Sequence, residues 1–537
     1  MDVLSWSSCL KYAVLALLLA GLFWTCARKL PPVLQQCGFK SIRMLRLYGR
    51  KDNMLFQRYF LLALALILTS GLLGISFLFL GPKLASAISL LPFVFFCLLF
   101  WWIDRNYALR VPLQEQRRQF RLEIVFFFLL AVVLYFAIVL LNVLDYVIAK
   151  ELFTAWKYVV LSLMPFLLPL LAAAANGILS GCENIWTKRH VMHAQAKLKE
   201  EMAVSIVIAG NCGTAVIKSA LCAMLSEKYA VCCVNDGENK LDGTAEFVEK
   251  LQTKSLQFFI AEADGKYTGE TAALCSMLHP QYAILAEACP AGLEGITDDP
   301  LTVRNEVFDC MGEEGLVVAF ADDLASMPKD HACRVRNLDH DAVKNVVCGR
   351  EDVSFMLELC GESISIHSKA LGAFSAKYIA AAAAMALELG VSAEQICAAV
   401  EGMDRVPHCM EVFERENITV LDFGACAHLH DAALAMEFLA GFQGRKIVVT
   451  PGMAELGVLE EGTNKAFGKI IAGADSLILI GDTLAGVIRD AALEAGLSKD
   501  SISVVPTYRK AGAAVHACAQ GDDVFLLLRV TVDDLGL

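Results

Sequence analysis

A glycine-rich turn near the middle of the chain carries the residues whose types and spacing favour phosphate binding. It runs from Ala209 to Lys218 and reads Ala-Gly-Asn-Cys-Gly-Thr-Ala-Val-Ile-Lys. Glycines between a strand and a helix allow backbone N–H groups to converge on an anion at the helix N-terminus. The residues of this turn are therefore our candidates for cofactor binding: Gly210, Asn211, Gly213, Thr214 and Lys218.

The same turn departs from the pattern of a working phosphate-binding loop. Such a loop places Lys after the last glycine, where it reaches the phosphates, and then Ser or Thr, which holds Mg²⁺. Here these two positions hold Thr214 and Ala215. A pair of glycines at this spacing also suits a tight turn with a purely structural role, so both interpretations stay open at this point.

The segments around the turn predict a parallel sheet covered by helices. From Val204 onward, short β-branched runs alternate with amphipathic stretches, which is typical of such α/β architecture. We expect five strands, at 204–209, 229–234, 256–261, 282–285 and 315–319, with helices that begin near Thr214, Thr271, Leu301 and Ser375. The segment 355–366 is broken at Cys360 and Gly361 and predicts an antiparallel hairpin that closes this sheet.

A second, smaller α/β unit is expected after Pro407. A helix should end there, because the residue before a proline avoids helical backbone angles. A hairpin follows, with arms at 410–413 and 418–422, and then strands at 446–449, 476–480 and 524–528. The two α/β domains would therefore occupy residues 203–404 and 405–537, both of ordinary domain size.

The N-terminal third has the composition of a membrane domain. The chain is 56% hydrophobic with a mean hydropathy of +0.53, whereas soluble proteins are typically about 45–50% apolar. The excess lies before residue 182, in runs near the roughly 20 residues that a spanning helix needs. We expect five spans within residues 1–182, at 12–26, 59–79, 84–102, 124–148 and 158–180.

Charge predicts the orientation of these spans and excludes one class of partner. Lys and Arg concentrate in the loops after the first and third spans, and such loops stay in the cytosol. The N-terminus would then lie outside, and a basic linker at 183–202 would lead into cytosolic domains. Residues 1–200 hold 21 Lys and Arg against 9 Asp and Glu, whereas the remainder holds 25 against 49. A basic collar above an acidic domain favours contact with membrane lipids and argues against nucleic-acid binding.

Cysteine and histidine usage gives little sign of a metal or disulfide framework. Of the 19 cysteines, 14 follow residue 200, on the side that we expect to face the reducing cytosol. They are best interpreted as small buried apolar residues. The His428-x-His430 pair is too weak a signal to define a metal site by itself.

The order of the segments after residue 203 resembles a known family, the Mur ligases, which are ATP-dependent enzymes that add amino acids to the peptidoglycan precursor. The most similar type adds D-alanyl-D-alanine to UDP-N-acetylmuramoyl-tripeptide. The resemblance begins with the glycine-rich turn and continues in register through these further motifs: Glu262, Gly269-Glu270, His279-Pro280, the Gly-Leu-Glu-Gly run at 292–295, the Arg-Asn-Glu-Val-Phe run at 304–308, Pro407 to Glu411, Asp422, and the Thr-Pro-Gly-Met-Ala-Glu-Leu-Gly run at 450–457.

The resemblance implies both a fold and a set of roles. The central domain should have a P-loop-type fold and the C-terminal domain a Rossmann-like one, with ATP and Mg²⁺ as cofactors. Glu262 would hold the metal, and Asp422 and Glu455 would be retained catalytic residues. Arg304 occupies the position of a catalytic Lys that the family carbamylates. Membrane spans stand where the family has its UDP-sugar-binding domain, which implies a bacterial, multi-pass, membrane-tethered relative.

Several family positions hold residues that cannot do the family's chemistry. Thr214 and Ala215 replace the phosphate-binding Lys and the metal-binding hydroxyl, and Gly292 replaces a His. Arg304 cannot be carbamylated and places a positive charge where a negative one is needed. Residues 373–377 and 424–428 lack the family's nucleotide-contact patterns, and Cys409 stands in place of an Arg.

We therefore expect a Mur-ligase-like protein of cell-envelope synthesis that is inactive or strongly altered as a ligase. Two alternatives remain. One is a competent D-alanyl-D-alanine-adding ligase in which Lys218 or Lys266 replaces the lost Lys. The other is a scaffold that binds peptidoglycan precursor or recruits wall-synthesis enzymes to the membrane.

Overall fold

The computed structural model describes most of the chain in two compact units, Met1–Ile185 and Trp186–Leu537. The described residues are 5–36, 39–48, 54–76, 88, 90–105, 116–148, 153–235, 239–252, 255–265, 267–288, 299–359, 361–415, 418–426, 428–453, 460–481 and 484–537. Three sequence candidates, Glu455, Lys266 and the 292–295 run, lie outside these residues.

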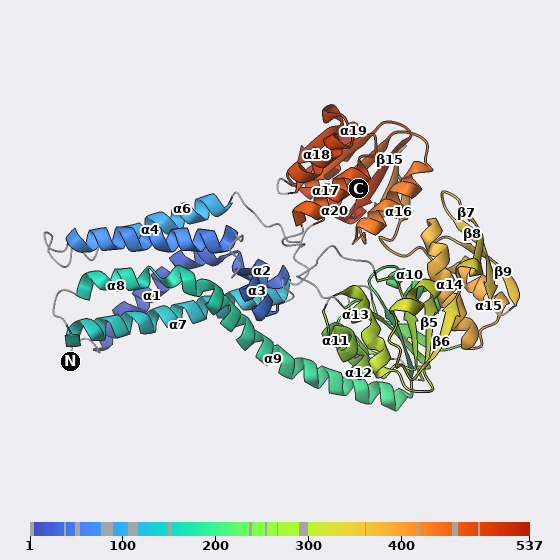
Figure 1. Ribbon diagram of the computed structural model, residues 1–537, viewed down its shortest axis with the longest axis horizontal. Helices are drawn as coiled ribbons and strands as arrows, with labels where there is room; N and C mark the ends of the chain where they lie inside the picture. The colour runs from blue at the N-terminus through green and yellow to red at the C-terminus, as the bar shows by residue number, and fades with distance from the viewer. Residues whose placement is uncertain are drawn as a thin grey trace. The chain divides into compact units, whose positions relative to one another are not determined.

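The first unit is entirely helical where it is described (Figure 1). Its helices are α1 (Trp6–Ala27), α2 (Leu30–Gln36), α3 (Ser41–Tyr48), α4 (Met54–Ser76), α6 (Leu91–Arg105), α7 (Gln116–Ile148), α8 (Phe153–Leu161) and the start of α9 (Met164–Glu201). Three stretches are long and apolar enough to cross a membrane: Trp6–Ala27, Arg118–Leu144 and Met164–Glu201. The second and third predicted spans are represented by shorter apolar helices at Tyr59–Leu73 and Leu91–Trp102, and residues 77–87 between them lie outside the described part.

The last predicted span, 158–180, differs from the structure in two ways. A single helix was expected over 158–180, but α8 ends at Leu161 and α9 begins at Met164. Helix α9 then continues to Glu201, so the predicted basic linker is helical and has no break. Within the second unit, Ala194 of this helix is fully buried, and the Lys197 ammonium donates to the Glu249 carbonyl over 2.8 Å.

The first α/β sheet of the second unit is wholly parallel, with strand order β2-β3-β1-β4-β5-β6. Its strands are β1 (Val204–Ala209), β2 (Val231–Cys233), β3 (Phe258–Ala263), β4 (Tyr282–Leu285), β5 (Leu316–Phe320) and β6 (Arg334–Leu338). The five predicted strands are confirmed. Strand β6 was missed because its sequence, Arg-Val-Arg-Asn-Leu, lacks an apolar run, as expected for an edge strand.

The helices and short 3₁₀ helices that accompany this sheet are α10 (Thr214–Ser226), α11 (Leu241–Lys250), α12 (Glu270–Leu278), α13 (Pro300–Asn305), η2 (Glu306–Cys310), η3 (Ala321–Ser326), η4 (His340–Ala342), α14 (Ala373–Glu388) and α15 (Ala393–Gly402). The predicted helix starts lie within two residues of the observed ones for α10, α12, α13 and α14. Helices α10 and α14 share one apolar cluster with the sheet.

The predicted hairpin forms, but it does not close the parallel sheet. Its strands β8 (Val353–Leu359) and β9 (Glu362–Ser368) pair antiparallel and join β7 (Val343–Cys348) in a separate three-stranded sheet. The expectation that it would close the first sheet was wrong. The unpredicted β6 forms the edge of that sheet instead.

The last part of the chain forms a second six-stranded sheet, of order β10-β11-β15-β12-β13-β14. The strands are β10 (Glu411–Arg415), β11 (Ile418–Phe423), β12 (Lys446–Thr450), β13 (Ser476–Ile480), β14 (Ile502–Val505) and β15 (Asp523–Leu528), with only β10 antiparallel to its neighbour. The accompanying helices are α16 (Leu429–Ala440), α17 (Glu460–Ile471), α18 (Ala485–Glu494), η6 (Lys499–Ser501), α19 (Tyr508–Cys518) and α20 (Val532–Leu535). The predicted hairpin and strands are confirmed, and the half-exposed edge strand β14 was missed.

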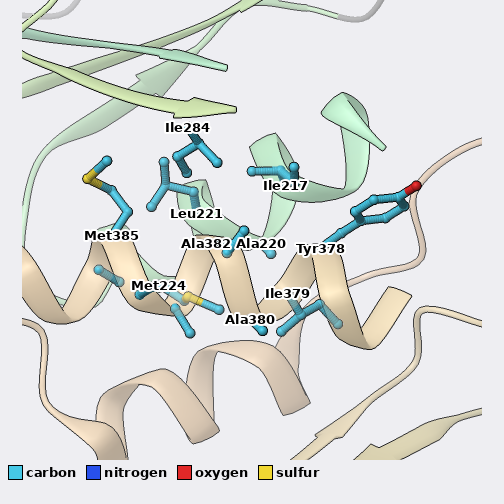
Figure 2. Close-up of a cluster of buried hydrophobic side chains, with 14 of the residues drawn as sticks. Ile217, Ala220, Leu221, Met224, Ile284, Tyr378, Ile379, Ala380, Ala382 and Met385 are labelled. Carbon is cyan, nitrogen blue, oxygen red and sulfur yellow. The ribbon is translucent and has the colours of Figure 1, made fainter. Parts of the chain in front are cut away.

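The core that positions the glycine-rich turn is a seam between α10 and α14. Figure 2 shows Leu221 and Met224 of α10 facing the small side chains of Ala380 and Ala382 on α14. All four are fully buried. Small residues on α14 let the two helices approach closely, and dense packing of this kind fixes the axis of α10 and therefore the place of its N-terminus.

Candidate functional site

The glycine-rich turn joins β1 to α10, as the sequence predicts, but three of its amides are engaged within the protein. The N–H groups of Asn211 and Cys212 donate to the Glu287 carbonyl over 3.0 and 3.2 Å, and the Gly210 N–H donates to the Ala263 carbonyl over 3.2 Å. These bonds tie the turn to the end of β3 and to the segment that follows β4. Backbone donors that would otherwise face an anion therefore have partners inside the fold.

An aromatic ring lies against the second glycine of the turn. Gly213 has a φ of +75°, and a Cβ atom at this position would stand 2.3 Å from the Tyr378 ring. Figure 2 shows Tyr378 at the edge of the apolar cluster, with its hydroxyl pointing away from the other labelled side chains. Gly213 is thus required both by its backbone angle and by the closeness of the ring.

Lys218 and Glu262 form a buried ion pair beside the turn. The Lys218 ammonium lies 2.7 Å from a Glu262 carboxylate oxygen and donates to the Val234 carbonyl over 3.1 Å. The two side chains are only 5% and 10% exposed. The candidate phosphate-binding cation and the candidate metal ligand therefore neutralise each other.

Arg304 is also buried and paired. Its guanidinium donates to an Asp323 carboxylate oxygen over 2.7 Å, to the Ala286 carbonyl over 3.1 Å and to the Ser326 hydroxyl over 3.3 Å. These bonds join α13 to η3 and to the end of β4. The several N–H donors of a guanidinium group suit this arrangement, and the arginine connects these segments through hydrogen bonds.

A third ion pair lies at the start of α14. The Lys377 ammonium is 2.5 Å from one Glu287 carboxylate oxygen, and the Tyr378 hydroxyl donates to the other over 3.0 Å. The His430 ring nitrogen is 3.7 Å from the same carboxylate. Burial raises the pKa of the Tyr378 hydroxyl, and the negative charge of Glu287 raises it further. Sequence reasoning missed Glu287, because no motif marks it.

Asp422 is fully buried at the end of β11 and accepts three hydrogen bonds. Its donors are the His408 ring at 3.0 Å, the Gly424 N–H at 2.8 Å and the Val532 N–H at 3.0 Å. A carboxylate with these partners holds the hairpin and the start of α20 together. The predicted role of Asp422 in catalysis, like those of Arg304 and Glu455, stays a prediction.

The described residues around the turn thus form three cation–carboxylate pairs: Lys218–Glu262, Arg304–Asp323 and Lys377–Glu287. Each pair has nearly zero net charge. Two of the pairs are removed from water, where the attraction between the partners is strong but the cost of desolvation is also high. The charges of these three cations are therefore balanced by neighbouring carboxylates.

We compared the sequence and the fold with those of known proteins. No family model matches the chain. The UDP-N-acetylmuramoyl-tripeptide–D-alanyl-D-alanine ligase of Escherichia coli is 23% identical over 291 residues, which cover 51% of this chain and 64% of that protein. The corresponding ligase of Mycobacterium tuberculosis is 25% identical over 367 residues, covering 62% of this chain and 72% of the relative. The chain therefore spans less than two thirds of the Escherichia coli protein.

Two solved structures share the fold. MurF from Acinetobacter baumannii superposes with a TM-score of 0.56 and 18% identity, over 64% of this chain and 77% of that one. MurF ligase from Thermotoga maritima, solved in complex with ADP, gives the same TM-score and identity over 64% and 80%. The chain shares the Mur ligase fold with these structures and is similar in sequence to the ligases of the D-alanyl-D-alanine-adding type. The resemblance inferred from the motifs is confirmed, and so is the predicted α/β fold class.

Proposed function

We propose that this MurF-like protein is a membrane-anchored component of peptidoglycan synthesis that has lost ATP-dependent ligation in the family's form. The observation that carries the proposal is the neutralised site: Lys218 is bound to Glu262, and Arg304 is bound to Asp323. Its relatives' names supply the pathway, and the altered site supplies the loss of chemistry.

The residues present do not fit a nucleotide with its magnesium. ATP bound with Mg²⁺ needs cations on the phosphates and fixed oxygen ligands on the metal. Thr214 and Ala215 stand where the family's Lys and hydroxyl would be, and Glu262 already shares its charge with a buried ammonium. Losing one group that stabilises developing charge typically lowers the rate about 10²–10³-fold, so several losses at the same phosphates should leave little turnover.

The helical first unit supports the membrane part of the proposal. Its helices carry large apolar side chains on their outer surface as well as inside, for example Leu18, Phe128 and Leu140, all more than half exposed. Contiguous apolar surface of this kind suits contact with lipid tails. We infer a multi-pass protein of the bacterial cell membrane, with the N-terminus outside, membrane lipids as its surroundings and the α/β domains in the cytoplasm.

The function that remains for such a protein is binding. In the proposal, the acidic α/β domains hold peptidoglycan precursor or recruit wall-synthesis enzymes at the membrane surface. Charge favours a protein partner over nucleic acid, because the residues after 200 carry a large excess of Asp and Glu.

The test is a turnover assay on the full chain in detergent. ADP release is measured with Mg-ATP, UDP-N-acetylmuramoyl-tripeptide and D-alanyl-D-alanine, with the Escherichia coli ligase as positive control. We expect no ADP release above background. ADP release that requires both substrates would overturn the proposal and favour a competent ligase that uses other cations.

A further inference from the structure

We propose that Cys212, His428 and Asp431 form a binding site for a divalent transition metal such as Zn²⁺. Cys212 belongs to the glycine-rich turn, whereas His428 and Asp431 lie at the start of α16. One ligand atom from each of the three side chains lies within 4.8 Å of the other two. Residues more than 200 positions apart in the sequence are thus brought together as a possible first coordination shell.

The separations are close to those that zinc requires. Zinc bonds of about 2.0–2.3 Å in a tetrahedral arrangement place the ligand atoms roughly 3.3–3.8 Å apart. Atoms within 4.8 Å of one another therefore need to close by at most about 1.5 Å, which side-chain rotation can supply. Three protein ligands leave a fourth position for water or a substrate atom, the pattern of an open zinc site.

Charge and ligand type both favour zinc over the magnesium of the family. A thiolate and a carboxylate together carry two negative charges, which match a divalent ion, and the neutral imidazole adds no charge. Thiolate and imidazole are preferred by Zn²⁺, whereas Mg²⁺ prefers oxygen ligands. Cys212 is 3% exposed, so a bound ion would be largely shielded from water at its sulfur ligand.

The backbone already holds the three ligands in place. The His428 N–H donates to the Asp431 carboxylate over 2.9 Å, and the Cys212 N–H donates to the Glu287 carbonyl over 3.2 Å. The Glu287 carboxylate lies 3.7 Å from the His430 ring, which links the same two segments a second time. Partners that fix a ligand's segment in this way favour metal binding, because less freedom is lost when the ion enters.

The ion would link the central and C-terminal domains. Cys212 comes from the glycine-rich turn of the central domain. His428 and Asp431 come from the start of α16 in the C-terminal domain. The inference does not depend on the loss of ligation, since a metal clamp is compatible with either outcome of the turnover assay.

A second acidic–histidine group provides an internal comparison. His408, Glu411 and Asp422 also have ligand atoms within 4.8 Å of one another. That group has no thiol, and the Asp422 carboxylate already accepts two backbone N–H bonds. It is the weaker candidate for zinc, and the spectrum of a bound ion distinguishes the two groups.

The test uses the full chain in detergent, stripped of metal with a chelator and titrated with ZnCl₂ against a competing chromophoric chelator. We expect about one equivalent of zinc per chain. Cys212→Ser and Asp431→Asn should each weaken binding at least about 100-fold, more than the loss of a supporting group does. Cys348→Ser, at an exposed cysteine elsewhere, and His408→Asn serve as controls that should bind like the wild type.

Cobalt substitution gives a readout that does not depend on how well a variant folds. Co²⁺ bound to the wild type should show a thiolate-to-cobalt charge-transfer band in the near ultraviolet, and Cys348→Ser should keep it. Absence of zinc binding would overturn the proposal. So would adventitious binding only, which would survive both Cys212→Ser and Asp431→Asn. A cobalt complex that lacks the thiolate band and is lost in His408→Asn would also overturn it.

Discussion

Helix α10 has two contrasting surroundings. Along its length, Leu221 and Met224 pack against the alanines of α14 in a fully buried apolar seam. At its start, the surroundings are polar: Lys218 is paired with Glu262, and the neighbouring turn is bonded to Glu287. The seam positions α10, whereas the polar end carries the turn that the sequence predicts as a phosphate-binding loop.

The difference shows that fold and chemistry are maintained by different interactions. Apolar packing depends on volume and shape, and it tolerates any change at the turn that keeps α10 in place. A nucleotide site depends on unbalanced charge, which a few substitutions can remove. Here the charged residues beside the turn are bound to one another, as in the pairs Lys218–Glu262 and Arg304–Asp323.

The largest effect is expected from Glu262→Leu. This change leaves the buried Lys218 ammonium without its carboxylate, and breaking a buried pair on one side typically costs about 3–5 kcal/mol. Thermal or denaturant unfolding of the purified chain measures the loss. The double variant Glu262→Leu with Lys218→Met should recover most of it. A single variant as stable as the wild type would mean that the pair does not form.

A similar loss is expected in the apolar seam. Leu221→Ala removes a fully buried side chain between α10 and α14 and should lower the free energy of unfolding by about 2–5 kcal/mol. The control is Leu324→Ala, at an exposed leucine in η3, which should change stability little. If Leu221→Ala and Leu324→Ala both unfold at the same temperature as the wild type, the seam does not hold α10 in place.

Gly213→Ala tests the contact between the turn and Tyr378. Alanine at a φ of +75° is strained and its Cβ would meet the ring, so we expect a loss of about 1–3 kcal/mol. Gly462→Ala, in α17 where nothing lies within 4 Å of the new atom, should stabilise the chain by about 0.5–1 kcal/mol. Equal effects at the two glycines would contradict the close approach of the ring.

The smallest effect is expected from Lys377→Gln. Its ammonium is bonded to Glu287 but is 36% exposed, and such partly solvated pairs contribute about 0–1 kcal/mol. Comparing its melting curve with that of Glu262→Leu shows whether burial determines how much these ion pairs contribute to the free energy of unfolding. A loss as large as that of Glu262→Leu would remove the distinction between them.

Much of the fold could be predicted from the sequence, because its core strands are apolar runs with clear ends. β1 and β4 were placed at their observed boundaries, and α10 begins at the predicted Thr214. The edge strands β6 and β14 were missed because their side chains are largely exposed and carry no alternating pattern. The predicted place of the 355–366 hairpin was wrong, since a local pattern predicts which strands pair with each other but not which sheet they join.

The site could be predicted only in part. The glycine-rich turn was recognisable from spacing, and the loss of the Lys and hydroxyl followed from the residues at 214 and 215. The pairing of Lys218 with Glu262, 44 positions away, was not predictable, because it depends on how β3 lies beside β1. Glu287 lies in no motif and Cys212 was part of the glycine-rich turn without a role of its own, and only the fold brings them near the start of α16.

The most direct test of the neutralised site is a calorimetric titration of the full chain with Mg-ATP, alongside a variant that carries Thr214→Lys and Ala215→Ser. The wild type should show no saturable, Mg²⁺-dependent binding up to about 1 mM nucleotide, which corresponds to less than about 4 kcal/mol of binding free energy. The variant should bind more tightly than the wild type, because it adds an unpaired cation. Micromolar, Mg²⁺-dependent binding by the wild type would contradict the account.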